Sequence, residues 1–242
     1  MKAVGFDQKI QLAHLDLTAN LLRQYPSKEM YSLLNVELMN SIKGDKSRKN
    51  AITMLMKTWN LVTPIIMDIR DALLNEYPYL SPTEKLITNY CLTCIAYPFF
   101  REQMFYIGKL LKMSNEIQSR SIVNEMKNRY GDRRRVEVAV GAVFSSAKDW
   151  LLLTMPKPGV YQAKKIEIEI QNPLLKALMI EVLMMHYEAN TVSTDIVNNS
   201  AIFYPFDYHI RIGDLDKERY SIIKNIRDTI IERNPKIPYS FE

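Results

Sequence analysis

The stretch NRYGDRRRVEVAVGAVFSSAKDW, residues 128–150, decides how the fold is interpreted, because it joins a glycine turn to a long amphipathic pattern. Gly131 is predicted to end one helix, since glycine readily adopts the left-handed conformation found after helix C-termini. Asp132 is predicted to cap the next helix, because its carboxylate can accept from the exposed amides of the first turn. That second helix has one continuous apolar face at helical spacing, formed by Val136, Val140, Val143, Ala147 and Trp150.

The face opposite the valines has small residues in its middle and basic residues at its ends. It is predicted to contain Arg134, Arg135, Glu137, Gly141, Ser145 and Lys148. Such a face can approach a DNA major groove, about 12 Å wide, without bulky side chains holding it off. Two other interpretations stay open. The arginines at 133–135 can be a solvated charge run or can pair with acids on the helical bundle, and Glu137 would oppose DNA.

The flanking sequence predicts a short strand before these helices and a hairpin after them. Residues 114–117 are predicted to be a small strand, and Ser119 is predicted to cap the helix that Gly131 ends. After Trp150, residues 151–154 are predicted to be a strand. The segment MPKPG, residues 155–159, forces a turn through its two prolines and its glycine. Residues 160–170 then alternate apolar and polar side chains, as a strand does.

This order of helix, glycine turn, long helix, strand, Pro/Gly hairpin and strand resembles the winged helix-turn-helix, over residues 112–170. The most specific segments are SRSIVNEMKNRYGD, RRRVEVAVGAVFSSAKDWLLL and TMPKPGVYQ. The resemblance implies a recognition helix whose N-terminal arginines contact duplex DNA, and a wing whose lysines reach phosphates. The predicted nucleic-acid-binding residues are Arg120, Lys127, Arg133, Arg134, Arg135, Ser145, Lys148, Lys157, Lys164 and Lys165.

The distribution of charge agrees with a polyanionic partner. The whole chain has a formal net charge of +5. Residues 112–165 contain eleven Lys/Arg and five Asp/Glu, a net of +6, so this segment, less than a quarter of the chain, carries all of the positive excess. Basic residues gathered in one region are the electrostatic footprint expected of nucleic-acid binding.

Composition and periodicity favour a mainly α fold class, a helical bundle with an embedded winged helix-turn-helix that carries a small β-hairpin. Of 242 residues, 47% are hydrophobic and only 7 are glycine. Three parts are predicted: an N-terminal helical domain (1–112), a winged-helix domain (113–172), and C-terminal helices with a short extended segment (173–242). In the last part, residues 216–233 are predicted to be an amphipathic helix with Tyr220, Ile223, Ile226 and Ile230/Ile231 on one side. The aromatic segment 203–214 is interpreted as a strand or ordered tail covering the core, with a base-stacking surface as the alternative.

The sequence contains no recognisable catalytic motif, so a non-enzymatic protein without cofactor or metal is expected. Cys91 and Cys94 have no second pair and no nearby histidine, which excludes a typical zinc site. His14, His186 and His209 are scattered along the chain. Asp68 and Asp71 lie three residues apart on a predicted helix, next to Arg70, and are interpreted as part of a solvated face.

We expect a cytoplasmic protein, since no secretory signal and no sufficiently long apolar stretch is present. The layout also resembles, more faintly, the A-component family of bacterial BREX phage-defence systems, through SRKNAITMLMKTW (residues 47–59). That resemblance implies an accessory protein of a multi-protein system. The predicted function is therefore DNA binding in a regulatory or accessory role. A scaffold that docks a protein partner through the winged helix is the alternative. A homodimer would suit paired DNA half-sites.

Overall fold

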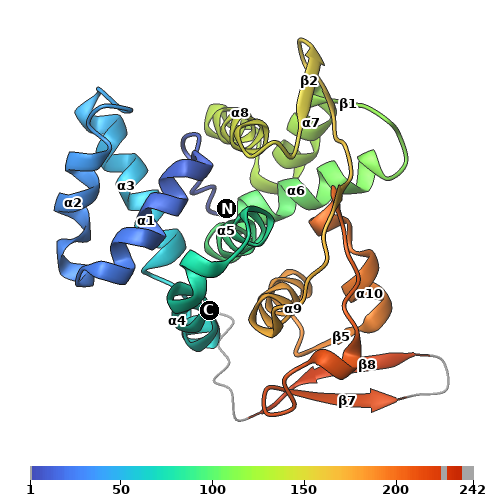
Figure 1. The fold of residues 1–242 in the computed structure, drawn as a ribbon. Helices are drawn as coiled ribbons and strands as arrows, with labels where there is room; N and C mark the ends of the chain where they lie inside the picture. The colour runs from blue at the N-terminus through green and yellow to red at the C-terminus, as the bar shows by residue number, and fades with distance from the viewer. Residues whose placement is uncertain (1, 225–227, 236–242) are drawn as a thin grey trace.

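The computed structural model describes residues 2–224 and 228–235 (Figure 1). The predicted mainly α class is confirmed, with about 60% helix and small β-sheets. In Figure 1, helices α1–α4 lie on the left, α7, α8 and the β2 hairpin at the top, and the β7–β8 hairpin at the bottom, around the central helices α5 and α9. Within the described ranges, none of the helices is long and apolar enough to cross a membrane.

The N-terminal part is a bundle of four helices that packs on α5. They are α1 (Leu12–Gln24), α2 (Met30–Glu37), α3 (Asp45–Trp59) and α4 (Met67–Glu76). The buried amide of Asn89, on α5, joins this bundle to the centre of the molecule. It accepts a hydrogen bond from the Trp59 indole at 2.9 Å and donates one to Asp16 at 2.8 Å. These bonds satisfy polar groups that would otherwise be costly to bury.

Two apolar helices form the centre of the core. The first, α5 (Pro82–Ala96), begins at a capping box in which Ser81 and Glu84 satisfy each other's backbone amides. The second, α9 (Pro173–Tyr187), is buried without interruption from Leu175 to Met184. A helix that is apolar all round is expected to be enclosed by other elements. One hydrophobic cluster includes buried residues from each of the three predicted parts of the chain.

The segment of the predicted winged helix forms two helices and a three-stranded sheet, and a third helix, α6, directly precedes it. The helices are α6 (Pro98–Leu111), α7 (Ser119–Tyr130) and α8 (Arg134–Asp149). The strands are β1 (Ile117–Gln118), β2 (Thr154–Lys157) and β3 (Val160–Gln162), antiparallel in the order β1-β3-β2. Ile117 pairs with Tyr161, so β1 lies on the far side of β3 from β2. Gly131 follows α7 with φ 92°, a conformation that glycine adopts without strain.

Two predicted helix caps in this segment are wrong. Gln118, not Ser119, occupies the position before α7, and no side chain caps that helix. Arg133, not Asp132, precedes α8, again without a side-chain cap. The Asp132 carboxylate instead forms an ion pair with Lys127, with the Lys127 Nζ 2.8 Å from Asp132 Oδ1. A cation on the preceding helix thus competes with the backbone amides for this carboxylate.

The chain after β3 contains more β-strand than predicted. The predicted strand over residues 160–170 is divided between β3 and β4 (Ile166–Glu167), and β4 pairs in parallel with β6 (Phe206–Asp207). A second three-stranded sheet has the order β5-β8-β7. Its strands are β5 (Thr191–Ser193), β7 (Tyr220–Lys224) and β8 (Thr229–Arg233), and the short helix α10 (Thr194–Asn199) follows β5.

The predicted amphipathic helix over residues 216–233 is therefore wrong, since its described residues include the antiparallel strands β7 and β8. Ile226 lies outside the described residues. The isoleucines of this segment are β-branched and suit a pleated surface. Tyr220, at the start of β7, is buried and donates to the Ala177 carbonyl at 3.2 Å on α9. Packing of the hairpin against α9 thus replaces the helix that the spacing of apolar residues suggested.

Candidate nucleic-acid interface

Helix α8 exposes one narrow strip to solvent. The strip is defined by Arg134, Val138, Gly141, Ser145 and Lys148, which follow one another at steps of four and three residues and so share one face. The Arg134 side chain is 86% exposed, and Val138 is 47% exposed. A Cβ placed on Gly141 would meet nothing within 4 Å. The middle of the strip is therefore open to a large approaching surface.

The opposite side of α8 is fixed by the core, as predicted. Val136, Val140, Val143, Ala147 and Trp150 are all essentially inaccessible to solvent. The buried amide of Gln103, on α6, donates to the Val140 carbonyl at 3.1 Å. Helix α8 is thus held rigidly, which is what a recognition surface requires.

The N-terminal segment, residues 2–12, covers one flank of α8. The Ile10 amide donates to Ser146 Oγ at 2.9 Å, and the Trp150 indole donates back to the Ile10 carbonyl at 3.0 Å. The Leu12 amide donates to Asp149 Oδ2 at 3.0 Å. The sequence alone did not suggest this packing. Because of it, only the strip and the first turn of α8 stay accessible to a partner.

Of the three consecutive arginines, Arg133 and Arg135 form hydrogen bonds with the N-terminal segment. Arg133 is partly buried, and its Nη2 donates to the carbonyls of Tyr130 at 2.7 Å and Lys2 at 3.2 Å. Arg135 donates to both carboxylate oxygens of Asp7, at 3.0 and 2.9 Å. The hydrogen bonds from Asp7 and its charge raise the pKa of the Arg135 guanidinium above its ordinary value.

Lys127 and Arg134 both form ion pairs with Glu137, the acid that was expected to repel DNA. Lys127 Nζ lies 2.6 Å from Glu137, and Arg134 Nη1 lies 2.8 Å from the other oxygen of the same carboxylate. The hydrogen bonds from Lys127 and Arg134 hold the pKa of Glu137 below its ordinary value. Hydrogen bonds from Asp132 and Glu137 raise the pKa of Lys127. The charge of Glu137 is thus balanced within the protein. The Arg134 side chain is more exposed to solvent than that of Lys127.

The remaining residues predicted to bind DNA have few partners. Among the residues that the structure describes, the side chains of Arg120, Lys148, Lys157 and Lys164 make no hydrogen bond or ion pair. Lys165 pairs with Asp207 at 3.2 Å. Ser145 is half-buried on the strip of α8. The strip therefore contributes Arg134 and Lys148 as accessible cations, and β2 and the segment after β3 contribute Lys157 and Lys164.

Sequence reasoning missed two residues at this surface. Val138 lies four residues after Arg134, so the helical spacing was enough to place it on the exposed strip. Asp7 gave no such signal, because it lies 128 residues from its partner Arg135.

The other residues considered from the sequence are occupied in the core or in ion pairs. Cys91 and Cys94 are buried thiols without a disulfide, and burial raises the pKa of each. Asp68 pairs with Arg219 and Asp71 with Arg70, so these two acids do not act together. In the described part of the chain, no group of histidine, cysteine and acidic residues is arranged to hold a metal ion.

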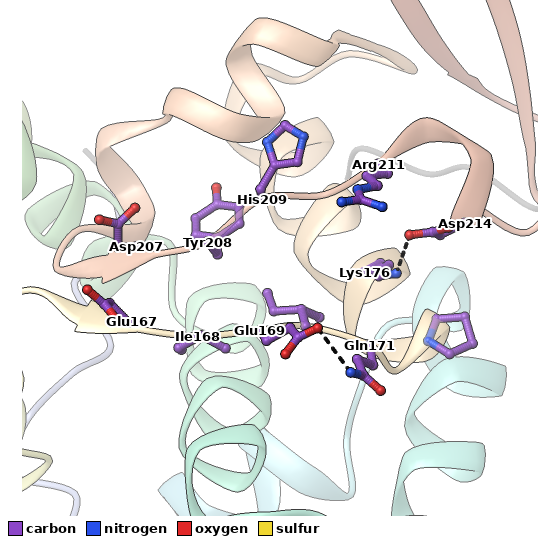
Figure 2. A pocket seen from close by; sticks show the side chains of 12 residues that line it. Glu167, Ile168, Glu169, Gln171, Lys176, Asp207, Tyr208, His209, Arg211 and Asp214 are labelled. Atoms are coloured by element: carbon purple, nitrogen blue, oxygen red, sulfur yellow. Dashed lines mark hydrogen bonds and ion pairs between the residues drawn. The ribbon is translucent and has the colours of Figure 1, made fainter.

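The aromatic segment 203–214 covers the core, as interpreted from the sequence, and also borders a cleft. Phe203, Phe206 and Ile210 are buried. The cleft has a volume of about 850 Å³ and lies between residues 167–173 and residues 207–214 (Figure 2). At one end Lys176 Nζ contacts Asp214 at 2.8 Å. This cleft is separate from the strip on α8.

No family model, no curated protein and no solved structure matches this chain, so its function is inferred from its own residues.

Proposed function

We propose that residues 112–170 form a winged helix-turn-helix and that the protein binds duplex DNA through it, as a non-enzymatic accessory or regulatory protein. The observation that carries the proposal is the exposed strip of α8. It has a cation at each end, Arg134 and Lys148, and small residues, Gly141 and Ser145, between them. A helix with such a face can lie in a major groove while its cations reach bases or phosphates.

The order of elements supports the same proposal. A short strand, two helices and a hairpin follow α6 in sequence, and β1 pairs with β3 to give the sheet order β1-β3-β2. The hairpin carries Lys157, and Lys164 follows it; both are exposed and without an ion pair among the described residues. Cations beside a recognition helix would contact phosphates and fix the register of the protein on the duplex.

Residues 47–59, which resemble the BREX A components, lie within α3 and pack into the core. Ile52, Met54, Leu55 and Trp59 are all buried. This resemblance therefore concerns the bundle and not the DNA-binding strip. It adds to the proposal only that the protein would act beside others in a multi-protein system such as phage defence.

A protein partner is the second candidate, favoured by apolar exposure on the same elements. Val138 on α8, Leu151 just after it and Met155 on β2 are 47%, 82% and 42% exposed. Large exposed apolar side chains are found where proteins dock on one another. In this alternative the paired charges at Arg135 and Lys127 are structural, and the strip receives a protein surface.

Fluorescence anisotropy with a labelled duplex of about 20 base pairs, across a salt series, tests the proposal. The wild-type protein is expected to bind at low salt and to lose affinity steeply as salt rises, because binding to phosphates releases counterions. Arg134→Ala/Lys148→Ala is expected to weaken binding about tenfold. The salt slope should fall by roughly 0.9 for each phosphate that the variant no longer neutralises.

The matched control is Arg23→Ala/Lys28→Ala, which removes two exposed cations from the N-terminal bundle. Its affinity is expected to stay within about twofold of the wild type. Equal losses of affinity from both pairs would show a nonspecific effect of net charge and would contradict the assignment to α8. Absence of any binding at low salt would overturn DNA binding altogether and favour the protein partner.

A further inference from the structure

The parallel pairing of β4 with β6 stops after two residues, and the two segments then separate around the 850 Å³ cleft (Figure 2). Ile166 pairs with Phe206 and Glu167 with Asp207. The last main-chain bond between the segments runs from the Ile168 amide to the Asp207 carbonyl at 2.9 Å. Beyond it, residues 168–171 and 208–211 border the opening without bonding to each other.

Main-chain groups that would continue this ladder are left facing the cleft. In a parallel ladder, alternate residues of a strand direct both their amide and their carbonyl to the same neighbour. The amides of Ile166 and Ile168 both donate toward β6. The next groups in the series are the carbonyl of Ile168, the amide of Ile170, and the amide and carbonyl of His209. In the described ranges none of these four groups forms a hydrogen bond.

The neighbouring residue Ile210 shows which way the main chain of His209 points. The Asn198 side chain on α10 accepts from the Ile210 amide at 2.7 Å and donates to the Ile210 carbonyl at 3.2 Å. Successive residues of an extended chain direct their main-chain groups to opposite sides. Because the groups of Ile210 point to α10, those of His209 point to the cleft. An extended chain placed there would satisfy groups on both borders.

The side chains at the border give the cleft an excess of negative charge. Four carboxylates line it, against the cations Lys176 and Arg211. Lys176 is already paired with Asp214, and Asp207 is paired with Lys165, so the acids without an ion pair among the described residues are Glu167 and Glu169. The carboxylates of Glu167 and Glu169 are exposed. Among the described residues, Glu169 accepts a hydrogen bond only from the side-chain amide of Gln171, at 3.1 Å. A ligand with a lysine or arginine would meet these two acids.

We propose that this cleft binds an extended, basic peptide segment of a partner protein by β-strand addition. The peptide backbone pairs with the free main-chain groups of Ile168, Ile170 and His209, and a lysine or arginine of the peptide contacts Glu167 or Glu169. Main-chain pairing supplies affinity in this mode of recognition, and side chains supply selectivity. The volume of the cleft lies in the range of about 300–1,000 Å³ typical of binding sites. The proposal does not depend on DNA binding by α8.

Three fluorescein-labelled peptides test the proposal by anisotropy with the full chain. The first has the sequence TKVKVT, the second is its acidic counterpart TEVEVT, and the third is TKVKVT with alternate backbone amides methylated. TKVKVT is expected to bind. The acidic and the methylated peptides are each expected to bind about tenfold more weakly, because one lacks the charge and the other lacks main-chain donors.

Charge reversal on the protein locates the site. Glu167→Lys/Glu169→Lys is expected to weaken TKVKVT binding about tenfold, while Glu29→Lys/Glu37→Lys, an exposed pair on the N-terminal bundle, leaves it unchanged. All four glutamates are exposed, and circular dichroism checks that both variants fold. The proposal is overturned if TKVKVT does not bind at a protein concentration of about 1 mM, where even a weak specific complex would form. Equal binding of the methylated peptide, or equal effects of the two double variants, would also overturn it. Sedimentation that shows a dimer for the wild type and a monomer for Glu167→Lys/Glu169→Lys would assign the cleft to a second copy of the chain instead.

Discussion

Asp7 accepts two hydrogen bonds from the guanidinium of Arg135, and so joins the N-terminal segment to the first turn of α8. Arg135 is still 60% exposed. The pair therefore contributes little to stability, because water and salt screen an exposed ion pair. Its larger effect is on the surface potential. Asp7 places a carboxylate beside the cations that we propose to contact DNA.

Asp7→Asn is expected to strengthen duplex binding about two- to threefold at low salt, because it frees Arg135 and removes a charge that repels phosphate. Anisotropy with the same duplex measures the change. Glu37→Gln removes one exposed acid from α2 and alters the net charge by the same amount. A similar gain from both variants would mean that Asp7 has no local influence on the strip of α8.

Two helical glycines are expected to respond oppositely to alanine. Gly141 lies on the exposed strip of α8 with open space around it, so Gly141→Ala should raise the free energy of unfolding by about 0.5–1 kcal/mol. A Cβ on Gly108 of α6 would lie 1.9 Å from the Ala201 carbonyl oxygen. Gly108→Ala must push α6 away from the 3-10 turn Ala201–Phe203 and is expected to cost about 3 kcal/mol. Urea unfolding measures both, and similar values for the two variants would contradict the close approach of α6 to this turn.

Local sequence signals predicted the two helices around Gly131 and the hairpin after them, but not the bounds of the strands. Residues 151–153 form no strand, and β2 begins at Thr154 and continues through residues 155–157, which were predicted to be part of the turn. The turn at Gly131, the valine face of α8 and the hairpin around Pro158 follow from glycine chemistry, helical spacing and proline chemistry. The partners of the arginines did not follow. Asp7 reaches Arg135 from the other end of the sequence, and no periodicity encodes such a pairing.

The C-terminal hairpin shows the opposite case, in which a local pattern was misleading. Tyr220, Ile223 and Ile230 have a spacing that suits a helix, yet Ile223 pairs with Ile230 across β7 and β8. The deciding residues are arginines. Arg219 and Arg233 are both buried against Glu181 on α9. Contact with a buried carboxylate on a distant helix is not encoded in the periodicity of the segment, whereas its β-branched isoleucines do favour strands.

Glu181 is accordingly expected to be important for stability. It is fully buried and contacts Arg219 Nε at 3.1 Å and the Tyr220 hydroxyl at 2.9 Å, besides Arg233. Glu181→Ala leaves two guanidinium groups without their buried counter-charge and should lower the free energy of unfolding by about 3–5 kcal/mol. Urea unfolding measures the loss. Asp68 binds the same Arg219 but is 69% exposed, so Asp68→Asn is expected to cost less than about 1 kcal/mol. Equal losses would show that burial of the carboxylate is not what matters.

His186 is expected to make the protein less stable as the pH falls from about 6.5 to about 4. Burial, and then the positive charge of Arg101, lower the pKa of His186 to about 4. Between this value and the ordinary pKa near 6.5, the unfolded chain binds a proton on this side chain and the folded chain does not. The contribution of the neutral His186 ring to the free energy of unfolding is therefore fully present above about pH 6.5. It is lost progressively toward pH 4, by about 2 kcal/mol after allowance for the exposed part of the ring.

His186→Phe removes the titrating group and keeps an aromatic ring against Phe105, whose ring centre lies 4.6 Å from that of His186. The free energy of unfolding, measured by urea at intervals from pH 4 to pH 7, should decline less steeply for this variant than for the wild type. Carboxylates titrate in both proteins, so the difference between the two curves isolates the histidine. His186→Gln, which also lacks a titrating group, should give the same difference. Parallel curves for all three proteins would mean that His186 is as readily protonated in the folded chain as in the unfolded one.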